Sequence, residues 1–312
     1  MKPPNDQRRI AASGIIVLLF LGMLIFASSL GVSNSSGPVP ITKITHMAHP
    51  PIDTVALMKV INPANGFQLP VAYASIGPKL IESGTIDLAR FQLDYQKNGW
   101  TLSNREIEIL THGSQEPITI SQKNKDFLFR LFWAIGLTNQ NTILNRETIQ
   151  ANGLKMEDMS SISAWKLSKK PALELFSRGN IVSLSPDQQS RVEEIARAVY
   201  LPCCDNPALF ADCSHGMAML GLLELMGSQG ASTDAMFSAA KQVSAFWFPQ
   251  QTQEKAIFMI ATQLKDYSAV ESRTLLSADY SSAKGFQQLH QWLATHGMLK
   301  DDSDNLVNCS DQ

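Results

Sequence analysis

The sequence predicts a mainly α-helical protein with a single N-terminal transmembrane helix, then a region of short helices and loops, and a C-terminal helical bundle. Three observations lead to this fold class. An uncharged apolar run lies near the N-terminus, apolar residues recur at helical spacing in much of the rest, and capping residues stand where these patterns begin and end. At 312 residues the chain can bury a sizeable core without disulfides or metals.

The first element, residues 10–31, is the predicted membrane anchor. Residues 10–30 carry no charge, and at about 1.5 Å per residue they span roughly 30 Å, the thickness of the hydrocarbon layer. Three basic residues precede this run and the next charge is Lys43, so the positive-inside rule leaves residues 1–9 in the cytoplasm and the body outside it. A cleaved signal peptide is the alternative, which would secrete the body into the same compartment. Residues 32–50 are small, polar and proline-containing, which is typical of a flexible spacer.

Two helices are predicted at the start of the body. In residues 86–97 apolar side chains recur at helical spacing, and Gly99 follows as expected near a left-handed C-cap. A shorter helix is predicted over residues 103–113. It opens with Ser103 and Glu106, which form a capping box because each side chain accepts a hydrogen bond from the other's backbone amide.

The next segments are less regular. Alternating isoleucines indicate that residues 117–120 are extended, and Ser121 is the predicted cap of a helix that continues to Ile135. Residues 137–184 mix polar clusters with short apolar runs, which predicts loops and short helices. Within them, the apolar run at residues 181–184 is the predicted strand.

The helical pattern returns in residues 185–298, which form the predicted bundle after the N-terminal part of the body, residues 51–184. Ser185 and Gln188 form a second capping box with proline at the first helical position. The polar tail, residues 299–312, follows the bundle. Further helices are expected at residues 213–226, 233–247, 251–265 and 282–296.

Three of the four cysteines lie close to a histidine in one short block of the bundle. Cys203 and Cys204 stand between two prolines, which restrict the backbone and predict a rigid turn. Asp212 is the predicted N-cap of the helix that follows, which would place Cys213 in the first turn, where the helix dipole favours a thiolate. His215 comes two residues later.

This block is a candidate metal site. Thiolates and a neutral imidazole are the ligands that zinc, copper(I) and other soft or borderline metals prefer. We therefore expect Cys203, Cys204, Cys213 and His215 to bind a transition metal, zinc or copper. The spacing is not that of a zinc finger, so the four side chains converge only if the loop turns sharply.

Disulfide bonding is the alternative role for the cysteines. An even cysteine count and an oxidising compartment would favour pairing Cys204 with Cys213 and Cys203 with Cys309. The chain would then be a non-catalytic binding or scaffold module of the cell envelope. A third hypothesis is a thiol-disulfide redox protein that uses Cys203 and Cys204.

Composition and missing motifs narrow the function further. With 26 Lys+Arg, 28 Asp+Glu and no block of like charge, the chain is not expected to bind nucleic acid. The sequence indicates the membrane as a partner of the chain. It identifies no protein partner. Motifs typical of nucleotide binding, acyl transfer, zinc proteases and calcium binding are missing. Cys213 and His215 have no third group to orient them, so the sequence favours a non-enzymatic protein.

Overall fold

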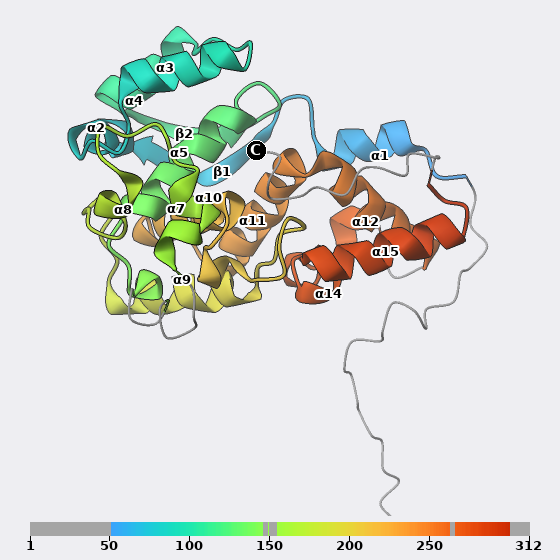
Figure 1. The fold of residues 1–312 in the computed structure, drawn as a ribbon. Helices are drawn as coiled ribbons and strands as arrows, with labels where there is room; N and C mark the ends of the chain where they lie inside the picture. The colour runs from blue at the N-terminus through green and yellow to red at the C-terminus, as the bar shows by residue number, and fades with distance from the viewer. Residues whose placement is uncertain (1–50, 146–148, 150–154, 263–265, 300–312) are drawn as a thin grey trace, which may run out of the picture. The chain divides into compact units, whose positions relative to one another are not determined.

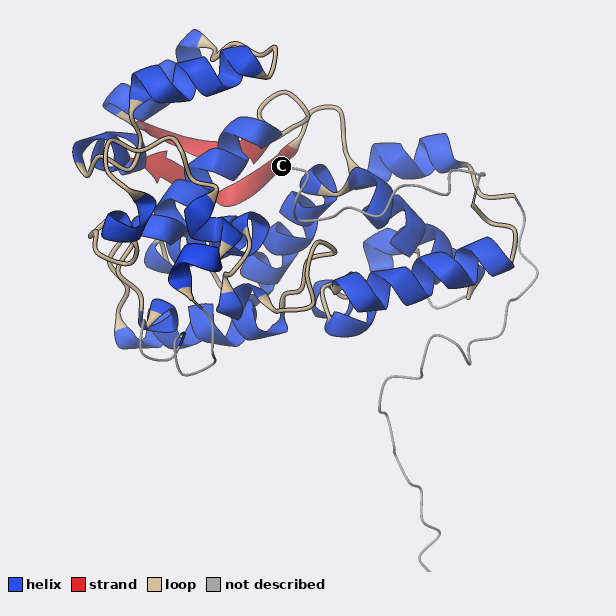
Figure 2. Ribbon diagram, viewed as in Figure 1, coloured by secondary structure: helices blue, strands red, loops and turns tan. Residues whose placement is uncertain are grey.

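The structure, a computed structural model, describes residues 51–145, 149, 155–262 and 266–299. Within these ranges it is mainly helical, as predicted, and contains one pair of strands (Figure 1, Figure 2). The predicted anchor and spacer lie outside the described residues, and so does Cys309 in the tail. None of the helices in the described ranges combines the length and the hydropathy that a bilayer crossing requires.

The first half of the described chain alternates helices with the two strands. Its elements are α1 (Thr54–Ile61), β1 (Phe67–Ala74), α2 (Ile76–Glu82), α3 (Leu88–Lys97), α4 (Asn104–His112), β2 (Ser114–Ile120) and α5 (Lys125–Thr138). β1 and β2 are antiparallel, with Phe67 opposite Ile120 and Ala74 opposite Ser114. β2 confirms the predicted extended segment. No element is predicted at β1, although its buried residues Leu69, Val71 and Tyr73 alternate along the strand. Pro70 is tolerated between them because both strands of a two-stranded sheet are edges.

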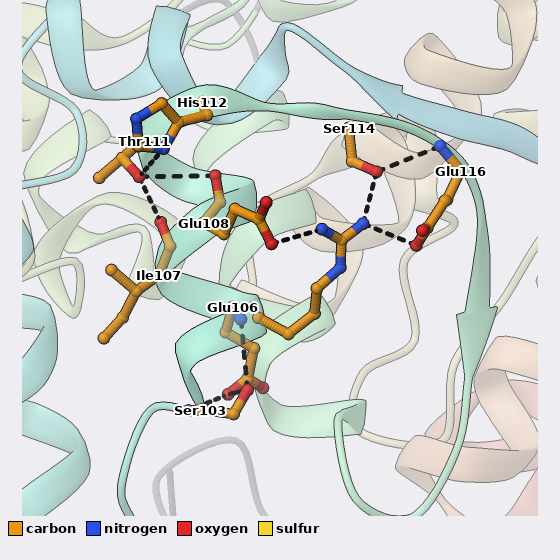
Figure 3. A network of polar contacts seen from close by, with 9 residues as sticks. Ser103, Glu106, Ile107, Glu108, Thr111, His112, Ser114 and Glu116 are labelled. Atoms are coloured by element: carbon orange, nitrogen blue, oxygen red, sulfur yellow. Dashed lines mark hydrogen bonds and ion pairs between the residues drawn. The ribbon is translucent and has the colours of Figure 1, made fainter.

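α3 and α4 confirm the two helices predicted at the start of the body. α3 begins after Asp87, whose side chain accepts hydrogen bonds from two amides of the first turn. In α4 the predicted capping box is present: Ser103 Oγ accepts from the Glu106 amide, and the Glu106 carboxylate accepts from the Ser103 amide (Figure 3). Arg105 donates to the Glu116 carboxylate of β2 at 2.6 Å, which joins the start of α4 to the strand.

Two predicted features are wrong because asparagine side chains provide bonds that the sequence pattern does not show. α5 begins after Asn124 and not after Ser121, whose amide and hydroxyl both donate to Asn124 Oδ1. The strand predicted at residues 181–184 does not form. Instead Asn139 Oδ1 accepts hydrogen bonds from the amides of Ile181 and the next residue, where a neighbouring strand would otherwise provide acceptors.

The remaining described elements are helical. They are η2 (Thr142–Leu144), η3 (Met156–Asp158), α7 (Ser160–Ser163), α8 (Ala172–Leu175), α9 (Pro186–Ala198), η4 (Ala208–Phe210), α10 (Ser214–Ser228), α11 (Thr233–Trp247), α12 (Pro249–Ala261), η5 (Tyr267–Ala269), α13 (Ser272–Leu275), α14 (Ala278–Ser281) and α15 (Ala283–Thr295). α9, α10, α11, α12 and α15 confirm the helices predicted after residue 185, and the Ser185–Gln188 capping box is present. The division of the body into two parts at residue 184 stays a prediction.

α5 and α10 pack against each other (Figure 1). Two glycines allow their backbones to touch. A Cβ atom on Gly221 would lie 2.0 Å from the carbonyl oxygen of Phe132, and one on Gly136 would lie 2.2 Å from that of Met217. The largest apolar cluster of the described residues surrounds this crossing. The close approach fixes the N-terminal end of α10 beside Phe129 of α5, which is where the cysteine block lies.

Candidate metal centre

The three clustered cysteines converge on one point. Cys204 Sγ lies 3.3 Å from Cys213 Sγ, and Cys203 Sγ lies 3.8 Å from Cys213 Sγ and 3.9 Å from Cys204 Sγ. Disulfide-bonded sulfurs are about 2.05 Å apart, so no disulfide joins these three to one another. The hypothesised Cys204–Cys213 disulfide is therefore absent, while the hypothesised partner Cys309 lies outside the described residues. All three sulfurs lie within 4.8 Å of one another, so the cluster can hold a metal ion.

The loop turns sharply because several bonds close it on itself. Tyr200 and Pro207 form an isolated antiparallel bridge that brings the two ends of the proline-bracketed turn together. Asn206 Nδ2 then donates to Asp212 Oδ2 at 2.8 Å, which joins this turn to the residue before Cys213. Ala211 adopts the left-handed conformation, with φ at 38°, and redirects the chain into α10. Together these features bring residues nine and ten positions apart into contact.

The start of α15 holds the exposed side of the same loop. The carbonyl oxygen of Cys204 accepts a hydrogen bond from the Ala283 amide at 3.0 Å. Asp205 Oδ1 accepts from the Lys284 amide at 2.7 Å. Sequence reasoning missed these contacts, because no local pattern connects the cysteine block to a helix about 80 residues later.

Cys213 is itself the N-cap of α10, which corrects the prediction that Asp212 caps this helix. Cys213 Sγ accepts a hydrogen bond from the Gly216 amide at 3.2 Å. The N-terminal end of α10, with its free backbone amides, therefore faces this sulfur. Cys203 and Cys213 are buried, whereas Cys204 is partly exposed and gives the cluster its accessible side.

His215 is not among the residues that the structure brings together at the cluster. Its imidazole is buried in an aromatic environment, with the ring centroids of Phe129 at 4.7 Å, Phe248 at 4.6 Å and Trp247 at 5.9 Å. His215 lies in the first turn of α10, whereas Cys213 precedes the helix as its N-cap in an extended conformation. Of the four residues that the sequence predicts as ligands, the structure thus brings the three cysteines together.

The sulfur triangle has the dimensions of one face of a tetrahedral thiolate site. The circle through the three sulfurs has a radius of about 2.1 Å, and with zinc–sulfur bonds of about 2.3 Å an ion would lie about 0.9 Å above their plane. A regular tetrahedron with the same bond length places the ion about 0.8 Å above the face. The triangle thus fits an ion with three thiolate ligands and room for a fourth.

Comparison of the chain with protein-family models, with curated proteins and with solved structures gives no significant match. The chemistry of the cluster must therefore be inferred from its own geometry.

Proposed function

We propose that this protein binds a soft transition-metal ion, zinc or copper(I), through Cys203, Cys204 and Cys213. The observation that carries the proposal is the mutual distance of the three sulfurs, 3.3 to 3.9 Å, which matches the separation of thiolates that share one metal. The hydrogen bond from Gly216 and the start of α10 compensate part of the negative charge that three thiolates bring. His215 is not part of this proposed ligand set.

Zinc and copper(I) differ in what else they require here. A zinc ion prefers four ligands, so it needs a fourth group, such as water, on the side that Cys204 leaves accessible. Copper(I) prefers soft thiolate ligands, and the three sulfurs alone would give it a three-coordinate site. A site of three thiolates with one accessible side is suited to receiving or releasing an ion rather than to permanent structural binding, where all positions are closed.

We also propose that the body is extracytoplasmic and tethered to the membrane by residues 10–31, with secretion after cleavage as the alternative. The uncharged run and its basic flank support this location. In an oxidising compartment thiols tend to form disulfides, and bonds to a metal would protect the three sulfurs from this pairing. Location and metal binding are therefore consistent with each other.

A thiol-disulfide function is the second candidate, and one contact favours it. Cys204 and Cys213 form the closest sulfur pair, at 3.3 Å, and Cys204 is partly exposed. Reactive thiols typically combine a helix N-terminus with partial exposure, and here Cys213 supplies the first feature and Cys204 the second. Metal analysis separates this candidate from the first.

The test uses the full-length chain in detergent, reduced under anaerobic conditions. It is titrated with zinc and, separately, with copper(I) in the presence of a competing chelator. We expect one equivalent of metal to bind, with loss of three titratable thiols. Cobalt(II), used as a spectroscopic substitute for zinc, should give thiolate-to-metal charge-transfer absorption.

Serine substitutions identify the ligands. Cys203→Ser, Cys204→Ser and Cys213→Ser should each weaken binding by on the order of 100-fold or more, since loss of a direct ligand costs at least as much as loss of a supporting group. Ser214→Ala, next to the cluster on the first residue of α10, is the matched control and should bind like the wild type. Failure of the reduced wild-type chain to bind either ion would refute the proposal. Reversible formation of a Cys204–Cys213 disulfide without metal would establish the redox function instead.

A further inference from the structure

A second pocket lies between α3, α5 and the segment of residues 164–167. Its volume is about 440 Å³, within the range of small-molecule sites. Aromatic rings form much of its wall: Trp100, Phe129, Trp133 and Trp165 all line it. None of the three proposed metal ligands lines this pocket, so an inference about it stands independently of the metal centre.

The tryptophans are held so that their rings face the pocket while their polar atoms are already bonded. Trp133 Nε1 donates to the Ser161 carbonyl at 2.8 Å, and Trp165 Nε1 donates to the Thr85 carbonyl at 3.1 Å. Both indoles are buried, at 8% and 3% exposure, whereas Trp100 is 41% exposed at the edge of the pocket. The two buried tryptophans thus form part of the pocket wall with their N–H groups already bonded, and Trp100 is the tryptophan with the most surface accessible to a ligand.

Trp133 contacts Phe129 and Trp165 at steep angles, and the three rings form no parallel slot. The ring planes of Trp133 and Trp165 are tilted by 66° at a centroid distance of 5.0 Å, and those of Phe129 and Trp133 by 51° at 5.6 Å. A flat base or cofactor ring binds best between two parallel rings, which this arrangement does not provide. A ligand that lays one apolar face on a single ring fits it better.

Charged groups on the pocket wall balance one another. Arg130 and Lys166 are basic, whereas Asp94 and Asp126 are acidic. Arg130 is fixed in place, since its guanidinium bonds the Asp94 carboxylate at 3.0 Å and lies over the rings of Tyr95 and Trp100. An anionic ligand would approach two carboxylates, and a cationic ligand would approach two cations. The pocket therefore favours an uncharged ligand.

An uncharged ligand that displaces water from the pocket must still replace the hydrogen bonds that water makes with these charged groups. Carboxylates need hydrogen-bond donors, and guanidinium, ammonium and amide N–H groups need acceptors, because an unpaired polar group costs about 1–3 kcal/mol on burial. Hydroxyl groups supply both roles. A pyranose ring carries such hydroxyls around its edge and an apolar C–H face that packs on tryptophan.

We propose that this pocket binds a neutral saccharide, with one sugar ring packed on the partly exposed side chain of Trp100 and hydroxyls bonded to Asp94, Asp126 and Arg130. Saccharide binding does not depend on the metal. The protein would thus have a carbohydrate-binding pocket in addition to the proposed metal site.

The experiment measures binding of cellotriose, maltotriose and chitotriose to the full-length chain by calorimetry and by tryptophan fluorescence. Binding of at least one of these sugars, with a change in tryptophan emission, is expected. Trp100→Ala should weaken it at least about tenfold, as expected from loss of an aromatic contact, and Trp100→Phe should recover part of the loss. Because Trp100 is partly exposed, the variant should fold, which circular dichroism checks.

Lys169→Ala is the matched control, since Lys169 lines the neighbouring pocket formed with Arg90 and Lys170 but not this one. It should leave sugar affinity unchanged. The proposal is overturned if none of the three sugars binds at millimolar concentration, or if Trp100→Ala binds like the wild type. Tighter binding of adenosine or of a galacturonate trisaccharide than of any neutral sugar would also overturn it, since that would assign the pocket to a flat or anionic ligand.

Discussion

Replacing Glu224 by glutamine should remove a pH dependence that is built into the core. Glu224 lies in the middle of α10 and is fully buried. Burial raises the pKa of its carboxyl to about 8, because the ionised form loses its hydration, although the hydrogen bond that Oε1 accepts from Asn141 opposes this effect. The folded protein therefore keeps Glu224 protonated at pH values where the unfolded chain releases the proton.

The sign and size of the effect follow from linkage. Between the ordinary pKa of 4.5 and about 8, the folded state binds more protons than the unfolded state, so the free energy of unfolding falls as pH rises through this window. At about 1.4 kcal/mol for each pH unit, the full loss is at most roughly 5 kcal/mol, and relaxation of the site reduces it to about 2–5 kcal/mol. Glu224→Gln has no ionisable group at this position. The free energy of unfolding of this variant should therefore not show the fall that Glu224 causes in this pH window.

The assay is denaturant unfolding of the full-length chain, followed by circular dichroism at intervals from pH 4.5 to 9. Glu224→Gln should be close to the wild type at pH 4.5 and more stable by about 2–5 kcal/mol at pH 9. Glu82→Gln, which removes an exposed carboxyl from α2, is the matched control and should follow the wild-type curve. If the two glutamine variants show the same pH dependence, the reasoning about Glu224 is refuted.

Two further predictions concern the core. Burial, with a smaller contribution from Lys241, lowers the pKa of Lys255 to about 7, so the wild-type stability should gain a component that rises with pH between about 7 and 10.5. Lys255→Met should abolish this rise in unfolding experiments, and a persisting rise would contradict the assignment. Gly221→Ala should lower stability by about 1–3 kcal/mol or more, since its Cβ would meet the Phe132 carbonyl. Gly227→Ala, whose Cβ meets only side-chain atoms at its closest contacts, should lose less, and equal losses in thermal unfolding would show that the α5–α10 contact is not tight.

The helices could be predicted because their signals are local. The capping boxes at Ser103 and Ser185 are complete within four residues, and both are present in the structure. β1 depends instead on β2, whose sequence begins 40 residues after β1 ends, and neither strand shows its partner in its own pattern. The opposite error occurred at residues 181–184, where Asn139 supplies the acceptor that makes a partner strand unnecessary.

The sequence predicts which residue types form the candidate site, but it does not predict how their side chains are arranged. Three cysteines in eleven residues indicate metal or disulfide chemistry by residue type alone. Their convergence depends on the left-handed Ala211 and on contacts from the start of α15, which no local pattern reveals. His215 belongs to the same sequence block, and its imidazole is buried among aromatic rings, which the block itself does not indicate.

The capping pattern of the chain gives a reason to assign chemistry to Cys213. Serine or aspartate side chains cap α1, α3, α4, α9, α11 and α15, as expected from the strength of oxygen acceptors. α10 has a thiol at this position. Sulfur is a weaker hydrogen-bond acceptor than oxygen, so this cap stabilises the helix less than a serine cap would. Cys213→Ser should therefore stabilise the metal-free protein, by up to about 1 kcal/mol, while it weakens metal binding. Opposite signs in these two measurements would show that the sulfur serves the metal and not the helix, whereas a loss of stability in the metal-free variant would assign Cys213 to packing.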